Sequence, residues 1–132
     1  MQLFNMGMRS IVNILLITVV VANNACNDKD KEKLTNNLFP NYLYKCASDA
    51  KLTPSKIAPC LEKGCGLSHE CADCFVAVGA CTIKSCITSC MFSPLGKKCQ
   101  ACAEEHCGAE LKTCTGLAHP LPNPTKKGDK CY

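Results

Sequence analysis

The stretch that decides the fold is residues 74–114, CFVAVGACTIKSCITSCMFSPLGKKCQACAEEHCGAELKTC. Its eight cysteines are arranged almost symmetrically about the turn sequence Ser93-Pro94-Leu95-Gly96. Steps of seven, five and four residues separate the cysteines before the turn, and steps of three, five and seven separate those after it. Pairing outward from the turn joins Cys90 to Cys99, Cys86 to Cys102, Cys81 to Cys107 and Cys74 to Cys114.

In each of these pairs the two residue numbers add up to 188 or 189. An antiparallel hairpin requires such a constant sum, because each residue lies opposite the one that is equally far from the turn. Ser68 is suited to cap a helix before the turn, and Gly116 to end one after it. The sequence therefore predicts a small, mainly α-helical, disulfide-rich fold with an antiparallel helical hairpin at about residues 68–92 and 97–115.

The five-residue steps are difficult to reconcile with two straight helices. The step from Cys81 to Cys86, like its counterpart after the turn, rotates the side chain about 140° around a helix axis. Either the helices break, for which Gly79 and Gly108 are candidates, or some cysteines pair with a third element. Cysteine spacing alone does not fix connectivity, so other pairings stay open.

The segments around the hairpin are predicted to be short helices and extended chain. Asn27 is a candidate N-cap of a first short helix, and a second one buries Tyr42, Leu43 and Cys46. Residues 52–66 contain prolines and glycines that predict single turns at most. Residues 117–132 form a proline-rich arm that is expected to run extended over the surface.

Six cysteines remain outside the hairpin ladder, namely Cys26, Cys46, Cys60, Cys65, Cys71 and Cys131. Their pairing stays open on the sequence alone, but we expect them to join the N-terminal segment and the arm to the hairpin. The total of 14 is even, which permits complete pairing. Disulfides contribute about 2–4 kcal/mol each, which suits a chain with few aromatic residues and no tryptophan.

Residues 1–22 are predicted to be a secretory signal peptide. Arg9 precedes an uncharged stretch, residues 11–22, that is shorter than the about 20 apolar residues a membrane span needs. Small residues favour cleavage after Ala22, with cleavage after Ala25 as the second choice and an uncleaved anchor as the alternative. Residues 23–132 then form a single cysteine-rich extracellular domain, and we expect the protein to be secreted.

The composition argues against nucleic-acid, metal and redox functions. Residues 23–132 carry 14 lysines, no arginine and 11 acidic residues, a net charge of +3, so nucleic-acid binding is not expected. The motifs Cys71-Ala-Asp-Cys74 and Cys99-Gln-Ala-Cys102 have zinc-site spacing, but oxidised cysteines do not bind metal. His69, His106 and His119 are interpreted as surface residues, so no catalytic, cofactor or metal site is predicted.

In size and cysteine count the chain is similar to secreted phospholipases A2. It lacks the adjacent cysteines followed by His-Asp that those enzymes need, and no other catalytic motif is present. Its composition and helical cysteine spacing resemble small cross-linked helical proteins such as ciliate pheromones and oomycete elicitins, although no motif matches residue by residue. The sequence therefore predicts a protein that is not an enzyme.

We predict a non-catalytic extracellular binding or signalling module, whose partner is an extracellular protein or a cell-surface receptor. The binding candidates are Leu95, Lys97 and Lys98 at the turn, together with arm residues 119–127. A membrane-active defence or toxin-like protein is the alternative, but the lysines are spread along the sequence, which favours the first hypothesis.

The secreted form is expected to lack residues 1–22 and to contain no free thiol. Intact mass before and after alkylation without reduction measures both properties. More than one alkylated cysteine in the native protein would contradict complete pairing.

Overall fold

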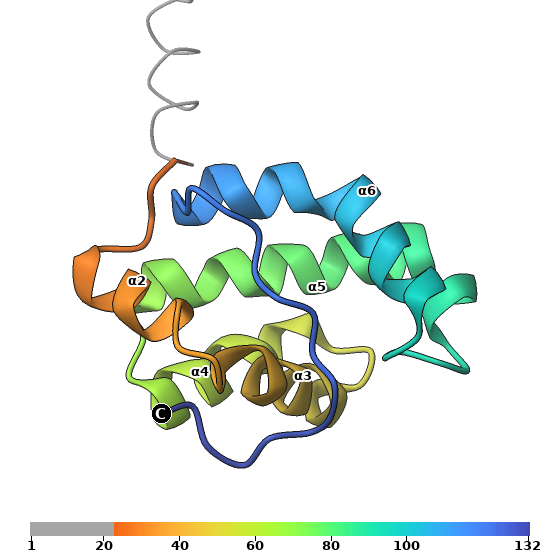
Figure 1. Ribbon diagram of the computed structural model, residues 1–132, viewed down its shortest axis with the longest axis horizontal. Coiled ribbons are helices and arrows are strands. Elements are labelled where there is room, and N and C mark those ends of the chain that lie inside the picture. The colour runs from red at the N-terminus through yellow and green to blue at the C-terminus, as the bar shows by residue number, and fades with distance from the viewer. Residues whose placement is uncertain (1–22) are drawn as a thin grey trace, which may run out of the picture.

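A computed structural model describes residues 23–132, and the predicted signal peptide lies outside these residues. The helices are α2 (Asp28–Leu34), α3 (Phe39–Ala50), the 3-10 helix η1 (Pro54–Lys56), α4 (Ile57–Cys65), α5 (His69–Cys90) and α6 (Lys97–Thr115). No strand occurs in the part of the chain that the structure describes. The small, mainly α-helical fold with an antiparallel hairpin is therefore confirmed. In Figure 1, α5 lies in the middle, with α6 above it and α3 and α4 below it.

The hairpin is formed by α5 and α6, and its ends are capped as the sequence predicts. The Ser68 side chain accepts a hydrogen bond from the backbone N–H of Cys71 at the start of α5. Gly116 ends α6 with φ of 75°, a left-handed conformation that glycine adopts without steric cost. Between the helices, the backbone N–H of Gly96 donates to the Ser93 carbonyl at 2.9 Å and closes the turn.

Four disulfides connect the two helices in the pairs that the constant sum indicates: Cys74–Cys114, Cys81–Cys107, Cys86–Cys102 and Cys90–Cys99. The expectation that the helices break or that a rung goes to a third element is wrong. Instead, both helices are continuous. The C-terminal half of α6 lies above α5, and the N-terminal part of α6 crosses in front of α5 near the turn (Figure 1). This crossing follows the cysteines as the five-residue steps move them around both helices. Gly79 does not break α5; it leaves room for the side chain of Ile57.

The prediction of single turns at most for residues 52–66 is also wrong, because α4 has nine residues. Pro59 is the third residue of α4, where its missing N–H has no partner within the helix in any case. Gly66 ends α4 in a left-handed conformation with φ of 66°. Gly64 lies against the ring of Tyr42, where any side chain would collide with the ring.

The hydrophobic core fills the space between α2, α3, α4 and the N-terminal half of α5. At its centre the rings of Phe39 and Phe75 meet edge to face, with 5.4 Å between centroids. The far half of the hairpin has no such core. Within residues 76–113, all of which the structure describes, the only buried side chains are Cys86, Cys99 and Cys107. Disulfides take the place of apolar packing there.

The six remaining cysteines form Cys26–Cys71, Cys46–Cys60 and Cys65–Cys131. The first joins the N-terminal segment to α5, as expected. The last joins the arm to α4 rather than to the hairpin, because the arm crosses in front of α5 and continues to the opposite side of the molecule (Figure 1). Two hydrogen bonds hold the arm where it crosses α5. The Gln100 side chain donates to the Pro124 carbonyl at 3.1 Å, and the Asn41 side chain accepts from the Thr125 N–H at 2.9 Å.

Replacing Cys86 and Cys102 by alanine is expected to loosen the far half of the hairpin alone. This disulfide closes a separation of 16 residues, for which loop entropy predicts about 3 kcal/mol, or about a 100-fold change in local opening. Amide hydrogen exchange measures the effect, which we expect between residues 83 and 103. The matched variant Cys74→Ala/Cys114→Ala, next to the core, should accelerate exchange in α3 and α4 as well. Equal acceleration throughout the chain in the first variant would contradict the separation into two halves.

Candidate functional site

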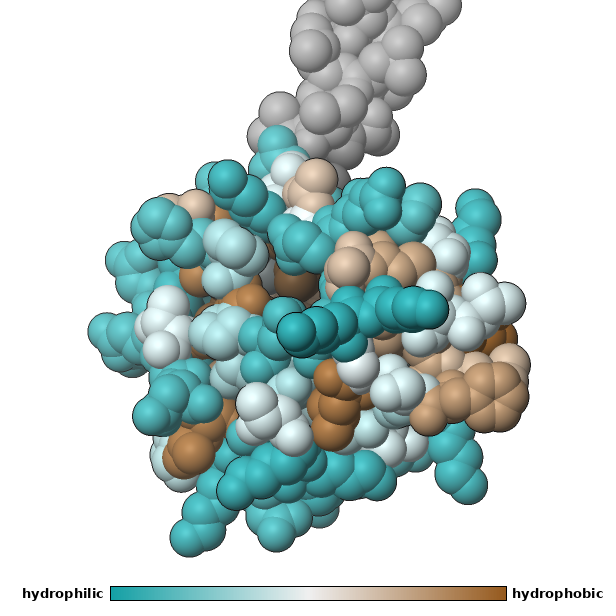
Figure 2. Space-filling view, turned by 45° about the vertical axis from the view of Figure 1, so that its right-hand side comes forward, coloured by the Kyte–Doolittle hydropathy of each residue, from teal (hydrophilic) through white to brown (hydrophobic). Residues whose placement is uncertain are grey.

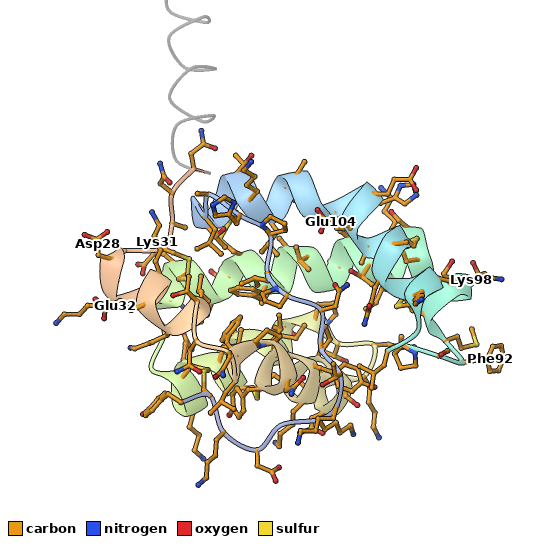
Figure 3. The ribbon with its side chains drawn as sticks, in the orientation of Figure 1. Asp28, Lys31, Glu32, Phe92, Lys98 and Glu104 are labelled. Carbon is orange, nitrogen blue, oxygen red and sulfur yellow. A yellow bond between two sulfur atoms is a disulfide. The ribbon has the colours of Figure 1, made fainter. Side chains whose placement is uncertain are left out.

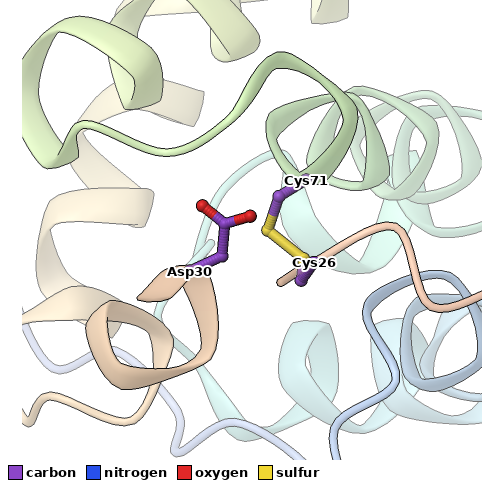
Figure 4. Close-up of side chains that lie close together, drawn as sticks. All are labelled: Cys26, Asp30 and Cys71. Atoms are coloured by element: carbon purple, nitrogen blue, oxygen red, sulfur yellow. A yellow bond between two sulfur atoms is a disulfide. The ribbon is translucent and has the colours of Figure 1, made fainter. Parts of the chain in front are cut away.

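One group of side chains has the composition of a metal site: Cys26, Asp30 and Cys71, all buried and with their potential ligand atoms within 4.8 Å of one another (Figure 4). The two sulfur atoms are bonded to each other. A disulfide sulfur is not the thiolate that binds zinc, so this group does not form a metal centre while the bond is intact. Both cysteines of the motif Cys71-Ala-Asp-Cys74 are disulfide-bonded, Cys71 to Cys26 and Cys74 to Cys114.

Asp30 is a buried carboxylate that connects α2 to the start of α5 through hydrogen bonds. Its carboxylate accepts hydrogen bonds from the Asn27 N–H at 3.1 Å, the Ser68 N–H at 2.9 Å and the Ser68 hydroxyl at 2.6 Å. The Ser68 hydroxyl oxygen in turn accepts from the Cys71 N–H at 3.3 Å. One carboxylate therefore completes the capping box of α2 and fixes the residue that caps α5.

The pKa of Asp30 reflects two opposing effects. Burial raises it, but the hydrogen bonds from Ser68 and Asn27 and the charge of Lys33 outweigh burial and leave the pKa below its ordinary value. The carboxylate is therefore ionised when the protein folds near neutral pH. A buried anion that accepts three hydrogen bonds in this way holds α2 against α5.

The histidines do not converge on a site. His69 is exposed, with Nδ1 at 2.7 Å from Glu62 Oε1 and Nε2 at 3.3 Å from Asp73 Oδ2. The hydrogen bond to Glu62 and the charge of Asp73 raise the pKa of His69. His106 and His119 are exposed at other places on the surface. Because Glu62 and Asp73 occupy both ring nitrogens of His69, this histidine forms a surface ion-pair cluster linking α4 to α5.

The most unusual surface lies where the hairpin turns. Phe92 is 92% exposed and its neighbour Met91 is 59% exposed. Lys84, Ile87 and Met91 follow one another at helical spacing, so they share one face of the end of α5. Lys97 and Lys98 are exposed at the start of α6. We call these six residues the hairpin tip: Lys84, Ile87, Met91, Phe92, Lys97 and Lys98.

The hairpin tip lies at the end of the molecule opposite α2, whose side chains alternate in charge. In Figure 3, Phe92 and Lys98 point outward at one end of the molecule, whereas Asp28 and Glu32 lie at the other end. Figure 2 shows apolar residues gathered on the side of the turn, next to hydrophilic surface. Residues 74–103 contain three lysines and no acidic residue. Exposed apolar side chains and lysines therefore occur together at the hairpin tip.

The predicted binding candidates fall partly within this surface. Lys97 and Lys98 belong to it, whereas Leu95 is half-buried and its carbonyl accepts a hydrogen bond from Gln100 at 3.1 Å. Sequence reasoning missed Phe92 and Met91. Their position between the last cysteine of α5 and the turn is a signal that they lie outside the cross-linked seam, but their exposure depends on tertiary structure.

Comparisons with protein-family models, curated proteins and solved structures return no match.

Among the described residues, α5 alone is long and apolar enough to cross a membrane by length and composition, with a mean hydropathy of 1.4 over its best window. Each of its five cysteines is bonded to a cysteine elsewhere in the domain. These bonds make α5 a central, disulfide-linked helix of the domain.

Asp30→Ala is expected to lower the free energy of unfolding at pH 7 by about 2 kcal/mol, since hydrogen bonds to a charged group are lost and their donors stay buried. The folded pKa of Asp30 is lowered, so the stabilisation is present above the unfolded pKa and is lost as pH falls through the folded pKa. Denaturant unfolding followed by circular dichroism should therefore show the two proteins converging as the pH falls below the ordinary pKa range of aspartate.

Asp28→Ala serves as the control for this experiment, because Asp28 is an exposed aspartate in the first turn of the same helix. It should change stability by less than about 1 kcal/mol. A difference between wild type and Asp30→Ala that stays constant from pH 7 to pH 2 would show that the ionised carboxylate is not its source.

Proposed function

We propose that the protein is a secreted, non-catalytic module that binds an extracellular surface or partner through the hairpin tip. The observation that carries this proposal is the exposure of Phe92, at 92%, beside a turn that the Cys90–Cys99 disulfide closes. A large aromatic side chain in water is costly, and such exposed apolar groups mark interaction sites when they cluster.

The covalent framework supports binding by lowering its entropic cost. Cys90–Cys99 and Cys86–Cys102 lie directly behind the turn, with sequence separations of 9 and 16 residues. A loop held in this way loses little conformational entropy when it meets a partner. Seven disulfides are typical of proteins in oxidising, extracellular compartments, which supports the proposed location.

Labelled protein is expected to bind intact cells of the producing organism saturably, and Phe92→Ala should weaken this binding about tenfold or more, because aromatic anchors dominate such interfaces. Leu52→Ala is the matched control, since Leu52 is 71% exposed but lies between α3 and η1, outside the hairpin tip. Both variants should keep the circular dichroism spectrum and disulfide mass of wild type.

Two results would count against the proposal. Equal cell binding by wild type and Phe92→Ala would remove the hairpin tip from the binding surface. Full activity after reduction and alkylation of all cysteines would mean that the rigid scaffold is not needed.

A further inference from the structure

We propose that the hairpin tip docks reversibly on an anionic lipid surface, with Phe92 and Met91 entering the interface and the lysines lying among the head groups. This inference rests on the proposed function, because it names the partner of the same surface. It differs from the membrane-active alternative in that the fold stays intact and the bilayer is not breached.

The apolar part of the hairpin tip has the geometry of an interfacial anchor. Phe92 and Met91 occupy the two positions directly after the end of α5, and Figure 3 shows Phe92 projecting away from the ribbon. Ile87, which is 39% exposed, follows them one turn back on the same helix. The most apolar and most exposed side chains are thus the outermost ones, as interfacial insertion requires.

The charged part of the hairpin tip consists of lysines. Lys84 lies two turns back from Met91 on the same face of α5, and Lys97 and Lys98 follow the turn. The nearest acidic residues along the chain are Asp73 and Glu104, and the register of the disulfides places Glu104 opposite Lys84, so the positive charge of the tip rests mainly on Lys97 and Lys98. Lysine carries a compact charge on a long flexible stem, which suits a layer of mobile phosphate and carboxylate groups. Each lysine near an anionic membrane adds attraction that salt screens.

A lipid surface explains the hairpin tip better than a protein partner does. Protein hot spots are enriched in tryptophan, tyrosine and arginine, and residues 76–113 contain none of the three. A standard protein interface also buries about 800 Å² on each partner, whereas the helix surface behind the tip is polar, with Ser85 and Thr88 exposed. Insertion into a lipid interface needs only a few exposed apolar side chains and neighbouring lysines.

The disulfides limit how deeply the protein can enter. Although α5 is apolar enough to span a bilayer, its five bonded cysteines attach it to α6 and to the N-terminal segment. The helix cannot leave the domain without breaking them. We therefore expect binding at the surface without leakage of vesicle contents.

Phe92→Trp provides a direct readout, because the chain contains no tryptophan. The probe is a phosphatidylcholine vesicle that contains about 30% phosphatidylserine, compared with phosphatidylcholine alone. Tryptophan emission should shift to shorter wavelength with the anionic vesicles only, and brominated acyl chains should quench it. Leu52→Trp places the same reporter on an exposed site outside the hairpin tip and should respond to neither vesicle.

Charge reversal separates specific docking from general attraction. Lys97→Glu/Lys98→Glu should weaken binding to the anionic vesicles at least about tenfold, and acidic residues in the first turn of α6 favour the helix, so the fold is preserved. The matched control is Lys29→Glu/Lys63→Glu, which changes the net charge equally on α2 and α4, where both lysines are exposed. We expect it to weaken binding less than about threefold.

The outcomes distinguish this inference from the function on which it rests. If Phe92→Trp gives no shift with anionic vesicles while Phe92→Ala still weakens binding to cells, the partner is a protein and only the lipid inference fails. If neither vesicles nor cells respond to changes in the hairpin tip, both proposals fail. Equal binding to neutral and anionic vesicles, or leakage of vesicle contents, would also overturn the inference.

Discussion

The constraint on which the rest of the structure depends is the covalent register between α5 and α6. Four disulfides join residues that are equally far from the turn, so neither helix can slide or rotate past the other without breaking a bond. Between residues 76 and 113 this register has no apolar core to support it, since the buried side chains there are cysteines. The disulfides, rather than apolar packing, therefore fix the position of the turn and of the side chains at the hairpin tip.

The two halves of the domain are stabilised differently, by an apolar core near α3 and α4 and by disulfides near the turn. Near α3 and α4 most apolar side chains are buried in the core around Phe39 and Phe75, although Leu52 and Tyr132 are exposed. In that half, the Asp30 carboxylate connects α2 to the start of α5 through its hydrogen bonds with Ser68. In the far half, stability does not require apolar side chains to be buried. Phe92 and Met91 are therefore free to face solvent without weakening the fold.

The same physical division decides what could be predicted from the sequence. The hairpin and its rungs follow from a local rule, because residue numbers on either side of a short turn determine which residues lie opposite each other. The crossing of α6 over α5 could not be predicted, since it depends on how the two helices accommodate all rungs at once. The length of α4 was missed because Pro59 was read as a helix breaker, although proline is tolerated in a first turn. The attachment of Cys131 to α4 depends on the path of the arm over the folded domain, which the spacing of cysteines in the sequence does not determine.

The exposure of Phe92 was equally invisible in the sequence, because an aromatic residue before a turn packs inward or outward according to what lies behind it. Here the Cys90–Cys99 disulfide joins the two helix ends, and the turn closes on itself through the hydrogen bond from the Gly96 N–H to the Ser93 carbonyl. Phe92 lies just beyond this cross-linked end and is exposed beside Met91. The end of the hairpin that disulfides hold without an apolar core thus also carries the side chain that we propose as the anchor.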